Sequence, residues 1–193
     1  MNDSGHRAFR VDPIDYTDGL PQLRAVRETV FVQEQQVPIE EEWDALDPDC
    51  VHVIARAQDG TPIGTGRLTP EHKIGRMAVL REWRGRGVGD ALLLTLIEQA
   101  HQRGWREVAL NAQVSAIAFY LRHGFQPVGE RFWEAGIEHQ AMRRALTARD
   151  AQRIAAAAEL DGTLYTSLSQ AGRDAVFALI EAGHYQMLVD EDE

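Results

Sequence analysis

The sequence is poor in cysteine and has no long hydrophobic run. Its one cysteine, Cys50, cannot form a disulfide within the chain, which is typical of proteins in reducing compartments. No apolar stretch approaches the ~18 residues of a membrane-spanning helix, and no charged-then-apolar signal opens the chain. Internal repeats and low-complexity tracts are missing too. We therefore expect a cytoplasmic protein without a membrane partner.

Positive charge is also scarce. The chain has 20 lysine and arginine residues against 30 aspartate and glutamate residues, a formal net charge of −10. Nucleic-acid binding needs a basic surface, so we expect no nucleic-acid partner. Hydrophobic residues make up 44% and charged residues 26% of the chain, as in ordinary globular proteins. A length of 193 residues suffices for one good core and a small appendage.

A glycine-rich loop is the most informative feature that is present. Arg84-Gly85-Arg86-Gly87-Val88-Gly89 lies between a strand-like run, 73–80, and a helical pattern, 90–101. The first N–H groups of a helix lack intrahelical partners, and glycines let the backbone approach an anion. Arg84 and Arg86 add positive charge beside them. The loop therefore predicts a phosphate site. The lysine of a P-loop and the G-x-G-x-x-G of a dinucleotide fold are both missing.

Periodicity predicts the order of the elements. Alternating and apolar runs indicate strands, helical spacing indicates helices, and Asp59-Gly60 indicates a hairpin turn. For the helix over 115–123, Ser115 is the expected N-cap and Gly124 the expected C-cap. The expected strands are 7–14, 51–57, 62–68, 73–80, 106–113, 126–132 and 137–143, and the expected helices are 20–35, 90–103 and 115–123.

Two segments carry a family resemblance. The R-x-x-G-x-G loop after a strand and before a helix resembles the acetyl-CoA pyrophosphate loop of GNAT-type N-acetyltransferases. The strand ending at Gln113, followed by SAIAFYLRHGF at 115–125, resembles the second half of the same CoA cleft. The segments LRAVRETVFVQEQ and GIEHQAMRR resemble the ElaA-like branch of that family. The resemblance covers about residues 7–146.

The resemblance implies an α+β fold with a GNAT-like mixed, mostly antiparallel twisted sheet of about six or seven strands flanked by helices. The acetyltransferase domain would span residues 1–146. Residues 147–193 lie outside the resemblance, and their composition predicts a C-terminal helical pair. So short a pair rarely folds alone, so we expect it to pack on the core or on a second subunit of a homodimer.

The resemblance also implies the cofactor contacts. The central strand would separate from its neighbour and pair its backbone with the pantetheine arm of acetyl-CoA, and one N–H would polarise the thioester carbonyl. Many family members carry Asn where this chain has Gln113, and Asn111 on the same strand face could share its role. No metal is expected. The implied cofactor residues are Met77, Ala78, Val79, Arg84, Gly85, Arg86, Gly87, Val88, Gly89 and Gln113.

For the catalytic groups, the resemblance places Tyr120 next to the thioester sulfur as the general acid. A phenol of pKa ~10 is neutral at pH 7, although a core tyrosine would fit the same position. The general base is left open between Glu34, Glu134 and His139. Glu34 could instead form a salt bridge with Arg24 or Arg27, and His139 could be an ordinary strand histidine.

An acidic stretch borders the expected acceptor side. Its carboxylates, from Glu34 to Asp49, would attract a cationic amine, or they form a solvated loop in which Trp43 stacks on the acceptor or pins the chain. We expect an acetyl-CoA-dependent N-acetyltransferase that acts by direct transfer on a primary amine. The acceptor would be a small cationic amine or a lysine or N-terminal peptide amine. The alternative is a non-catalytic acyl-CoA-binding sensor or scaffold on the same fold.

Overall fold

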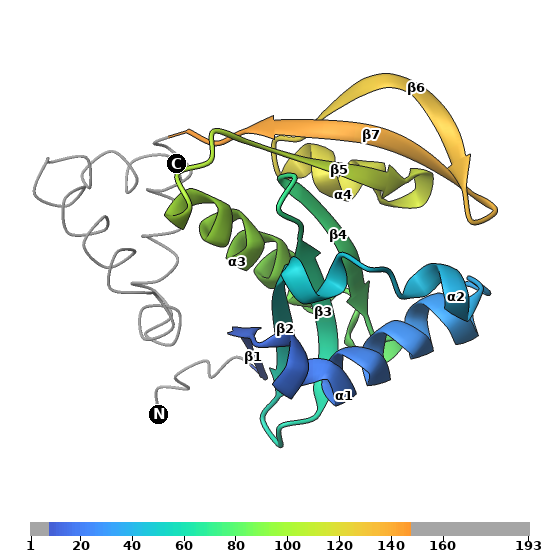
Figure 1. The fold of residues 1–193 in the computed structure, drawn as a ribbon, viewed down its shortest axis with the longest axis vertical. Coiled ribbons are helices and arrows are strands. Elements are labelled where there is room, and N and C mark those ends of the chain that lie inside the picture. The colour runs from blue at the N-terminus through green and yellow to red at the C-terminus, as the bar shows by residue number, and fades with distance from the viewer. Residues whose placement is uncertain (1–7, 148–193) are drawn as a thin grey trace, which may run out of the picture.

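The computed structural model describes residues 8–147, which form a seven-stranded sheet flanked by helices (Figure 1). The expected α+β architecture is therefore confirmed. The strands are β1 (Phe9–Ile14), β2 (Val51–Ala57), β3 (Pro62–Leu68), β4 (Lys73–Val79), β5 (Glu107–Gln113), β6 (Gln126–Glu134) and β7 (Ile137–Ala145). The helices are α1 (Tyr16–Arg27), the π-helix η1 (Glu28–Glu34), α2 (Ile39–Glu42), α3 (Val88–Gln102) and α4 (Ile117–Arg122). Short 3₁₀ turns are η2 (Asp47–Asp49), η3 (Arg81–Trp83) and η4 (Val114–Ala116). The expected C-terminal helical pair lies outside the described residues.

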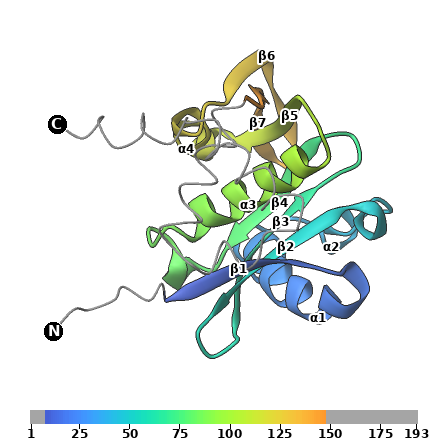
Figure 2. The ribbon, with the colours of Figure 1, turned by 90° about the vertical axis from the view of Figure 1, so that its left-hand side faces the viewer.

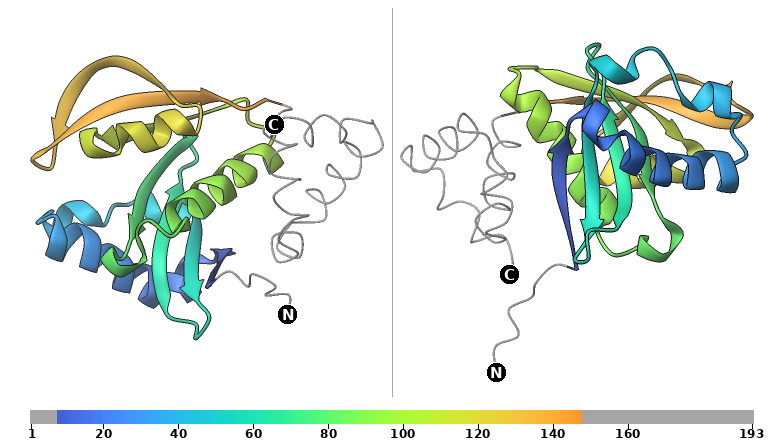
Figure 3. Two further views of the ribbon diagram at one scale, coloured as in Figure 1. Left: turned by 180° about the vertical axis from the view of Figure 1, so that it is seen from behind. Right: turned by 60° about the horizontal axis from the view of Figure 1, so that its bottom comes forward.

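The strand order is β1-β2-β3-β4-β5-β7-β6, and every neighbouring pair is antiparallel except β4 with β5. That parallel contact consists of two residue pairs, Lys73 with Ala109 and Ile74 with Leu110. Beyond Ile74 the two strands separate. Figures 1 and 3 show β5, β6 and β7 turning away from the strands β1 to β4. The separation leaves one edge of β4 unpaired in the middle of the sheet.

A bulge interrupts β4 where the separation begins. The register against β3 shifts between Thr65 and Arg67, and Arg76 on β4 has a φ of +49°. A non-glycine residue in this left-handed region is uncommon and is characteristic of turns and bulges. The bulge changes the direction of the strand at the point where it leaves β5.

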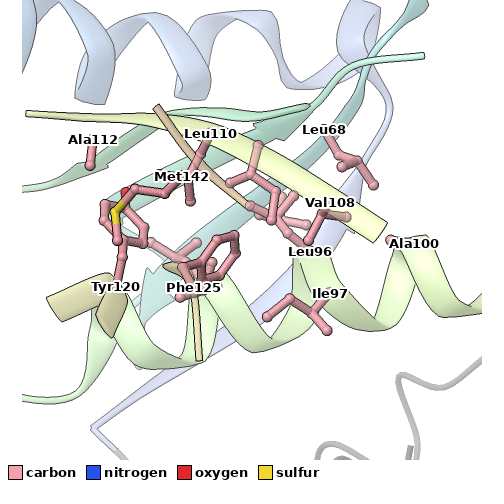
Figure 4. Close-up of a cluster of buried hydrophobic side chains, with 14 of the residues drawn as sticks. Leu68, Leu96, Ile97, Ala100, Val108, Leu110, Ala112, Tyr120, Phe125 and Met142 are labelled. Atoms are coloured by element: carbon pink, nitrogen blue, oxygen red, sulfur yellow. The ribbon is translucent and has the colours of Figure 1, made fainter. Parts of the chain in front are cut away.

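Helices α1 and α3 cover opposite faces of β2, β3 and β4 (Figure 2). The larger core lies under α3, because its apolar residues repeat with helical spacing and meet the inward side chains of the strands. Figure 4 shows this cluster, in which Leu96 and Ile97 lie near Val108, and Phe125 packs beside Tyr120 and Met142. A smaller cluster on the α1 face contains Val26, Val30, Phe31 and Ala78.

Two glycines of β3 set how closely α3 approaches the sheet. A Cβ on Gly64 would lie 2.9 Å from Leu92 Cδ1 and 3.1 Å from Val88 Cγ1. A Cβ on Gly66 would lie 2.8 Å from Leu96 Cδ1. Such distances are shorter than van der Waals contact, so a side chain at either position would displace the helix or its leucines.

The hairpin predicted over 51–57 and 62–68 has those bounds, whereas two helix ends differ from prediction. The first helix starts before residue 20, because Asp15 caps it by accepting hydrogen bonds from the N–H groups of Thr17 and Asp18. Ser115 does not cap α4, since it lies within η4 and Ala116 is the N-cap. Gly124 does end this helix, with a φ of +80°. None of the helices within 8–147 is long and apolar enough to cross a bilayer.

Candidate active site

A cleft of about 620 Å³ opens where β4 and β5 separate. One wall comes from β4 with Met77, and the other from β5 with Asn111 and Gln113. Tyr120 of α4 and His139 of β7 line it as well. The cleft thus brings together residues predicted from four separate stretches of sequence.

The glycine loop connects the end of β4, one wall of this cleft, to α3, and none of its residues lines the cleft itself. Gly85 and Gly87 have φ values of +70° and +80°, and a Cβ added to either would meet no atom within 4 Å. Gly87 is the N-cap of α3 and offers no side-chain cap, so the first N–H groups of this helix lack side-chain acceptors. Open space, free N–H groups and the positive end of the helix dipole suit a phosphate group. The loop therefore fits the pyrophosphate of an acyl-CoA.

The remaining loop residues contribute differently. The side chain of Val88 is buried in the core, so only its backbone can face an anion. A Cβ on Gly89 would lie 3.6 Å from the Phe119 ring, so this residue faces α4. Arg86 lies over the ring of Trp83 at 5.3 Å and forms no salt bridge within the described residues. It is the arginine of this loop whose charge is available for a phosphate.

Arg84 is already bonded, contrary to the expectation that it adds free positive charge. Its Nη1 and Nη2 atoms donate to the two carboxylate oxygens of Glu34 at 2.7 and 2.8 Å. Its Nε atom donates to the carbonyl oxygen of Val79 at 2.9 Å. A bidentate arginine–carboxylate pair has favourable geometry and neutralises both charges. Arg84 therefore joins the loop to the end of β4 and to η1.

The backbone of β4 presents alternate residues to the cleft. Leu80 N–H donates to Ile63 O of β3, and groups two residues apart in a strand point the same way. Ala78 accordingly faces β3, where it pairs with Thr65. Met77 and Val79 point their backbone groups away from β3, toward the separation from β5. Of the three residues expected to pair with the pantetheine arm, this geometry favours those two.

Gln113 contacts a residue that the sequence did not single out. Its Nε2 atom donates to Oε1 of Gln35 at 2.8 Å, and both side chains line the cleft. Gln35 follows η1 directly. A hydrogen bond therefore crosses from the end of the first helical segment to the wall formed by β5.

Tyr120 is buried, with 8% of its surface exposed, and it still lines the cleft. Its ring packs edge-on against Phe119 and Phe125, with centroids 5.0 and 5.8 Å away. Burial raises the pKa of the phenol to about 12. No hydrogen bond within residues 8–147 engages its hydroxyl group. The group is therefore neutral at pH 7 and free to donate.

His139 has a defined tautomer. Its Nδ1 atom lies 2.9 Å from the carbonyl oxygen of Ile137, and a carbonyl only accepts, so Nδ1 carries the proton. In the neutral imidazole the lone pair is then on Nε2. The ring stacks on Phe132 at 5.8 Å and lies opposite Gln113 across the β5–β7 pairing. His139 thus lies in the cleft with Nδ1 already bonded, which leaves Nε2 as the atom that can accept a proton.

Glu34 does not line the cleft. Its carboxylate is held by Arg84 and lies 3.5 Å from Arg81. The hydrogen bond from Arg84 is the main reason why the pKa of Glu34 lies below its ordinary value. The expected alternative partners are wrong, since Arg24 pairs with Glu28, and Arg27 with Glu42 and Asp47.

The acidic stretch is neither a solvated loop nor a freely available anionic surface. Glu42 and Asp47 are buried and accept hydrogen bonds from Arg27, and Arg67 joins Asp47 to Asp44. Arg76, the bulge residue of β4, contacts Glu42 and Asp44 from the other side. Trp43 lies 4.0 Å from the Arg27 guanidinium and so pins the chain to α1. Most of these carboxylates serve the fold.

Three cleft carboxylates remain without a charged partner within the described part of the chain. They are Glu41 in α2, Glu71 before β4 and Glu134 at the end of β6. No cluster of three or more potential metal-binding His, Cys, Asp or Glu side chains occurs between residues 8 and 147. The cleft therefore offers a histidine, a buried phenol, unpaired carboxylates and the ammonium group of Lys73.

Comparisons with known proteins identify the family to which this fold belongs. The model of the acetyltransferase (GNAT) domain matches residues 20–146. An uncharacterized N-acetyltransferase of Bacillus subtilis, YjcF, is 40% identical over 124 residues, which are 62% of this chain and 87% of that protein. The crystal structure of an acyl-CoA N-acyltransferase from Pseudomonas aeruginosa matches with a TM-score of 0.63 and 34% identity, covering 71% of this chain and 99% of that one. That of Escherichia coli ElaA has a TM-score of 0.63 and 28% identity, covering 70% and 99%.

The chain belongs to the GNAT acetyltransferase family and is an N-acetyltransferase. The resemblance found in the glycine loop and in the segment after β5 is thereby confirmed.

Proposed function

We propose that this protein transfers an acetyl group from acetyl-CoA directly to the primary amine of a small cationic acceptor. The observation that carries the proposal is the composition of one cleft. It combines the free hydroxyl of Tyr120, the Nε2 atom of His139, which has no hydrogen-bond partner within the described residues, and three unpaired carboxylates. The glycine loop after β4 fits a pyrophosphate, and the free edge of β4 fits an extended pantetheine arm.

His139 is the proposed general base. A primary ammonium has a pKa near ~10, so a proton must leave before or during attack on the thioester. The Nε2 atom of His139 takes the nitrogen proton, directly or through one water, while Ile137 O holds Nδ1–H. The C–N bond of the product amide forms as the thioester C–S bond breaks.

Tyr120 is the proposed general acid. Its hydroxyl donates a proton to the departing sulfur, and the tyrosinate is reprotonated from solvent. Burial disfavours the tyrosinate, as the pKa of about 12 indicates, so the phenol is in its donating form throughout the neutral range. A backbone N–H of Met77 or Val79 on the free edge of β4 supplies the hydrogen bond to the thioester carbonyl.

The proposed acceptor class follows from the cleft's remaining charges. Glu41, Glu71 and Glu134 form no ion pair within the described residues, in contrast to the arginine-paired Glu42 and Asp47. They outnumber Lys73, the one lining cation without an ion pair among the described residues. Unpaired carboxylates lining a recess attract cations and raise their local concentration. A diamine, a polyamine or an aminoglycoside would leave a second ammonium group to pair with them after one amine has entered the reaction.

The proposal is tested by release of free thiol from acetyl-CoA across an amine panel. The panel contains polyamines, aminoglycosides, amino acids, glucosamine and lysine peptides, and each amine with a second cationic group is matched by an analogue that lacks it. We expect turnover to be concentrated among the small multivalent cations. Tight acetyl-CoA binding without turnover on any amine would support a sensor instead, and preference for lysine peptides would move the acceptor class to proteins.

A His139→Gln variant tests the base. Because glutamine cannot take a proton, we expect kcat to fall about a hundredfold, within the usual contribution of a general base. The acid limb of the pH–rate profile should disappear, and the residual rate should follow deprotonation of the amine. His72→Gln is the control, since His72 stacks on Trp105 at 3.8 Å and does not line the cleft. A wild-type pH profile in His139→Gln would exclude the role.

A further inference from the structure

The segment between α1 and α2 has an unusual backbone. Residues Glu28–Glu34 form a π-helix, a rare geometry that recurs at functional sites, and Gln36 just beyond it has a φ of +59°. Val30 and Phe31 anchor the segment in the smaller core against β4. The last turn therefore emerges from a fixed base close to the cleft.

Two consecutive side chains at this end reach in different directions. Glu34 binds the guanidinium of Arg84 in the glycine loop, and Gln35 binds Gln113 of β5. The first residue thus contacts the loop that fits a pyrophosphate, and the second contacts the opposite wall of the cleft. Together the two side chains connect the end of η1 both to the glycine loop and to β5.

The Arg84 side chain has little capacity left for another partner. Its three nitrogen atoms donate to Glu34 and to Val79 O. Val79 is the last residue of β4, and its carbonyl lies on the side that faces away from β3. Through Arg84, Glu34 therefore fixes the loop to the end of the strand along which the pantetheine arm would lie.

We infer that Glu34 is a positioning residue that acts through Arg84 to hold the pyrophosphate loop in register with the free edge of β4. This inference rests on the proposed use of acetyl-CoA and deepens it. It also gives the Glu34 carboxylate a role other than proton transfer, since two arginines surround it outside the cleft.

The experiment compares Glu34→Gln with Glu82→Gln. Glu82 lies in η3 of the same loop and forms no salt bridge within the described residues, so both variants remove one negative charge near the loop. Glu34→Gln should weaken acetyl-CoA binding, measured by calorimetry, about tenfold, the lower range for hydrogen bonds to charged groups. Glu82→Gln should bind as well as wild type or slightly better, because a carboxylate beside the anion site is gone.

Two further readouts separate positioning from catalysis and from general damage. The pH–rate profile of Glu34→Gln should keep its wild-type shape, and kcat/KM for S-acetylpantetheine, which lacks the pyrophosphate, should stay unchanged. In an Arg84→Met background, Glu34→Gln should have no additional effect, because the partner through which it acts is gone.

The inference is overturned if Glu34→Gln binds acetyl-CoA as Glu82→Gln does, if it loses activity equally on S-acetylpantetheine, or if its pH profile loses a limb. Failure of the wild-type protein to bind acetyl-CoA would overturn the proposed function and the inference together. Wild-type binding with an unaffected Glu34→Gln would overturn the inference alone.

Discussion

Replacing Tyr120 by phenylalanine is expected to lower kcat about a hundredfold and to leave the affinity for acetyl-CoA within about twofold of wild type. The two side chains have nearly the same shape, so the packing against Phe119 and Phe125 is preserved. Only the hydroxyl disappears, and it forms no hydrogen bond within residues 8–147 that the folded protein would lose. The loss should therefore fall on departure of the thiolate.

Steady-state thiol release and calorimetric binding of acetyl-CoA together check this prediction. Tyr16→Phe is the matched control, since Tyr16 belongs to α1 and its ring lies against His52 instead of in the cleft. A loss of less than about threefold in Tyr120→Phe would show that this residue is an ordinary core tyrosine. Comparable losses of kcat in both variants would show that the substitutions act by destabilising the fold.

Asp47→Asn should lower the free energy of unfolding by about 3–5 kcal/mol, the range for breaking a buried ion pair from one side. Asp47 has none of its surface exposed and accepts hydrogen bonds from Arg27 at 2.8 Å and Arg67 at 2.8 Å. The amide would leave two buried guanidinium groups without a full counter-charge. Such a loss is a large part of the stability of a typical domain.

Urea denaturation at pH 7 measures this loss, and the same experiment at lower pH checks its cause. Burial tends to raise the pKa of Asp47, but Arg27 and Arg67 outweigh burial and hold it below its ordinary value. A carboxyl whose pKa is lowered by folding stabilises the protein above its unfolded pKa of ~3.9 and loses that contribution as the pH falls toward its folded pKa. Asp47→Asn should therefore show a weaker loss of stability on acidification than wild type.

Glu107→Gln is the control for that experiment. Glu107 and Arg143 form an exposed pair at 3.3 Å, and exposed pairs contribute at most about 1 kcal/mol. Equal effects of the two substitutions, or an unchanged acid dependence in Asp47→Asn, would contradict a structural role for the buried network. Glu42 is left unchanged in both variants. Burial raises its pKa, so its contribution to the free energy of unfolding changes with pH in the opposite direction to that of Asp47.

The sequence predicts those features whose cause is local. The glycines at 85 and 87 have the positive φ that a turn into a helix requires, and the hairpin turn at Gly60 has a φ of +88°. Strand alternation gave β2 and β3 their bounds and placed Asn111 and Gln113 on one face. Tyr120 was instead singled out by the family resemblance of the segment after β5, whereas the end of its helix at Gly124, in the left-handed region, was a local prediction.

Features that depend on distant residues were not predicted. The expected single helix over 20–35 contains a π-helix, because packing of Val30 and Phe31 and the bonds of Glu34 and Gln35 decide its last turns. The buried charge network joins Arg27 to Glu42 and Asp47, which lie 15 and 20 positions away, and Asp47 to Arg67, a further 20 positions along the chain. One signal was available: Arg27 follows Leu23 by four residues and lies on the apolar face of α1, where an arginine needs buried partners.

The glycines of β3 control the position of the anion loop from a distance. Gly64 and Gly66 let α3 lie deep against the sheet, and the first turn of α3 carries the N–H groups of the anion loop. A single methyl group at either position would act as a spacer that lifts the helix, and the loop with it, away from β4. A substitution at Gly64 or Gly66 should thus lower activity, although neither glycine lines the cleft. The absence of a side chain at Gly64 and Gly66 therefore determines how close the cofactor loop lies to β4.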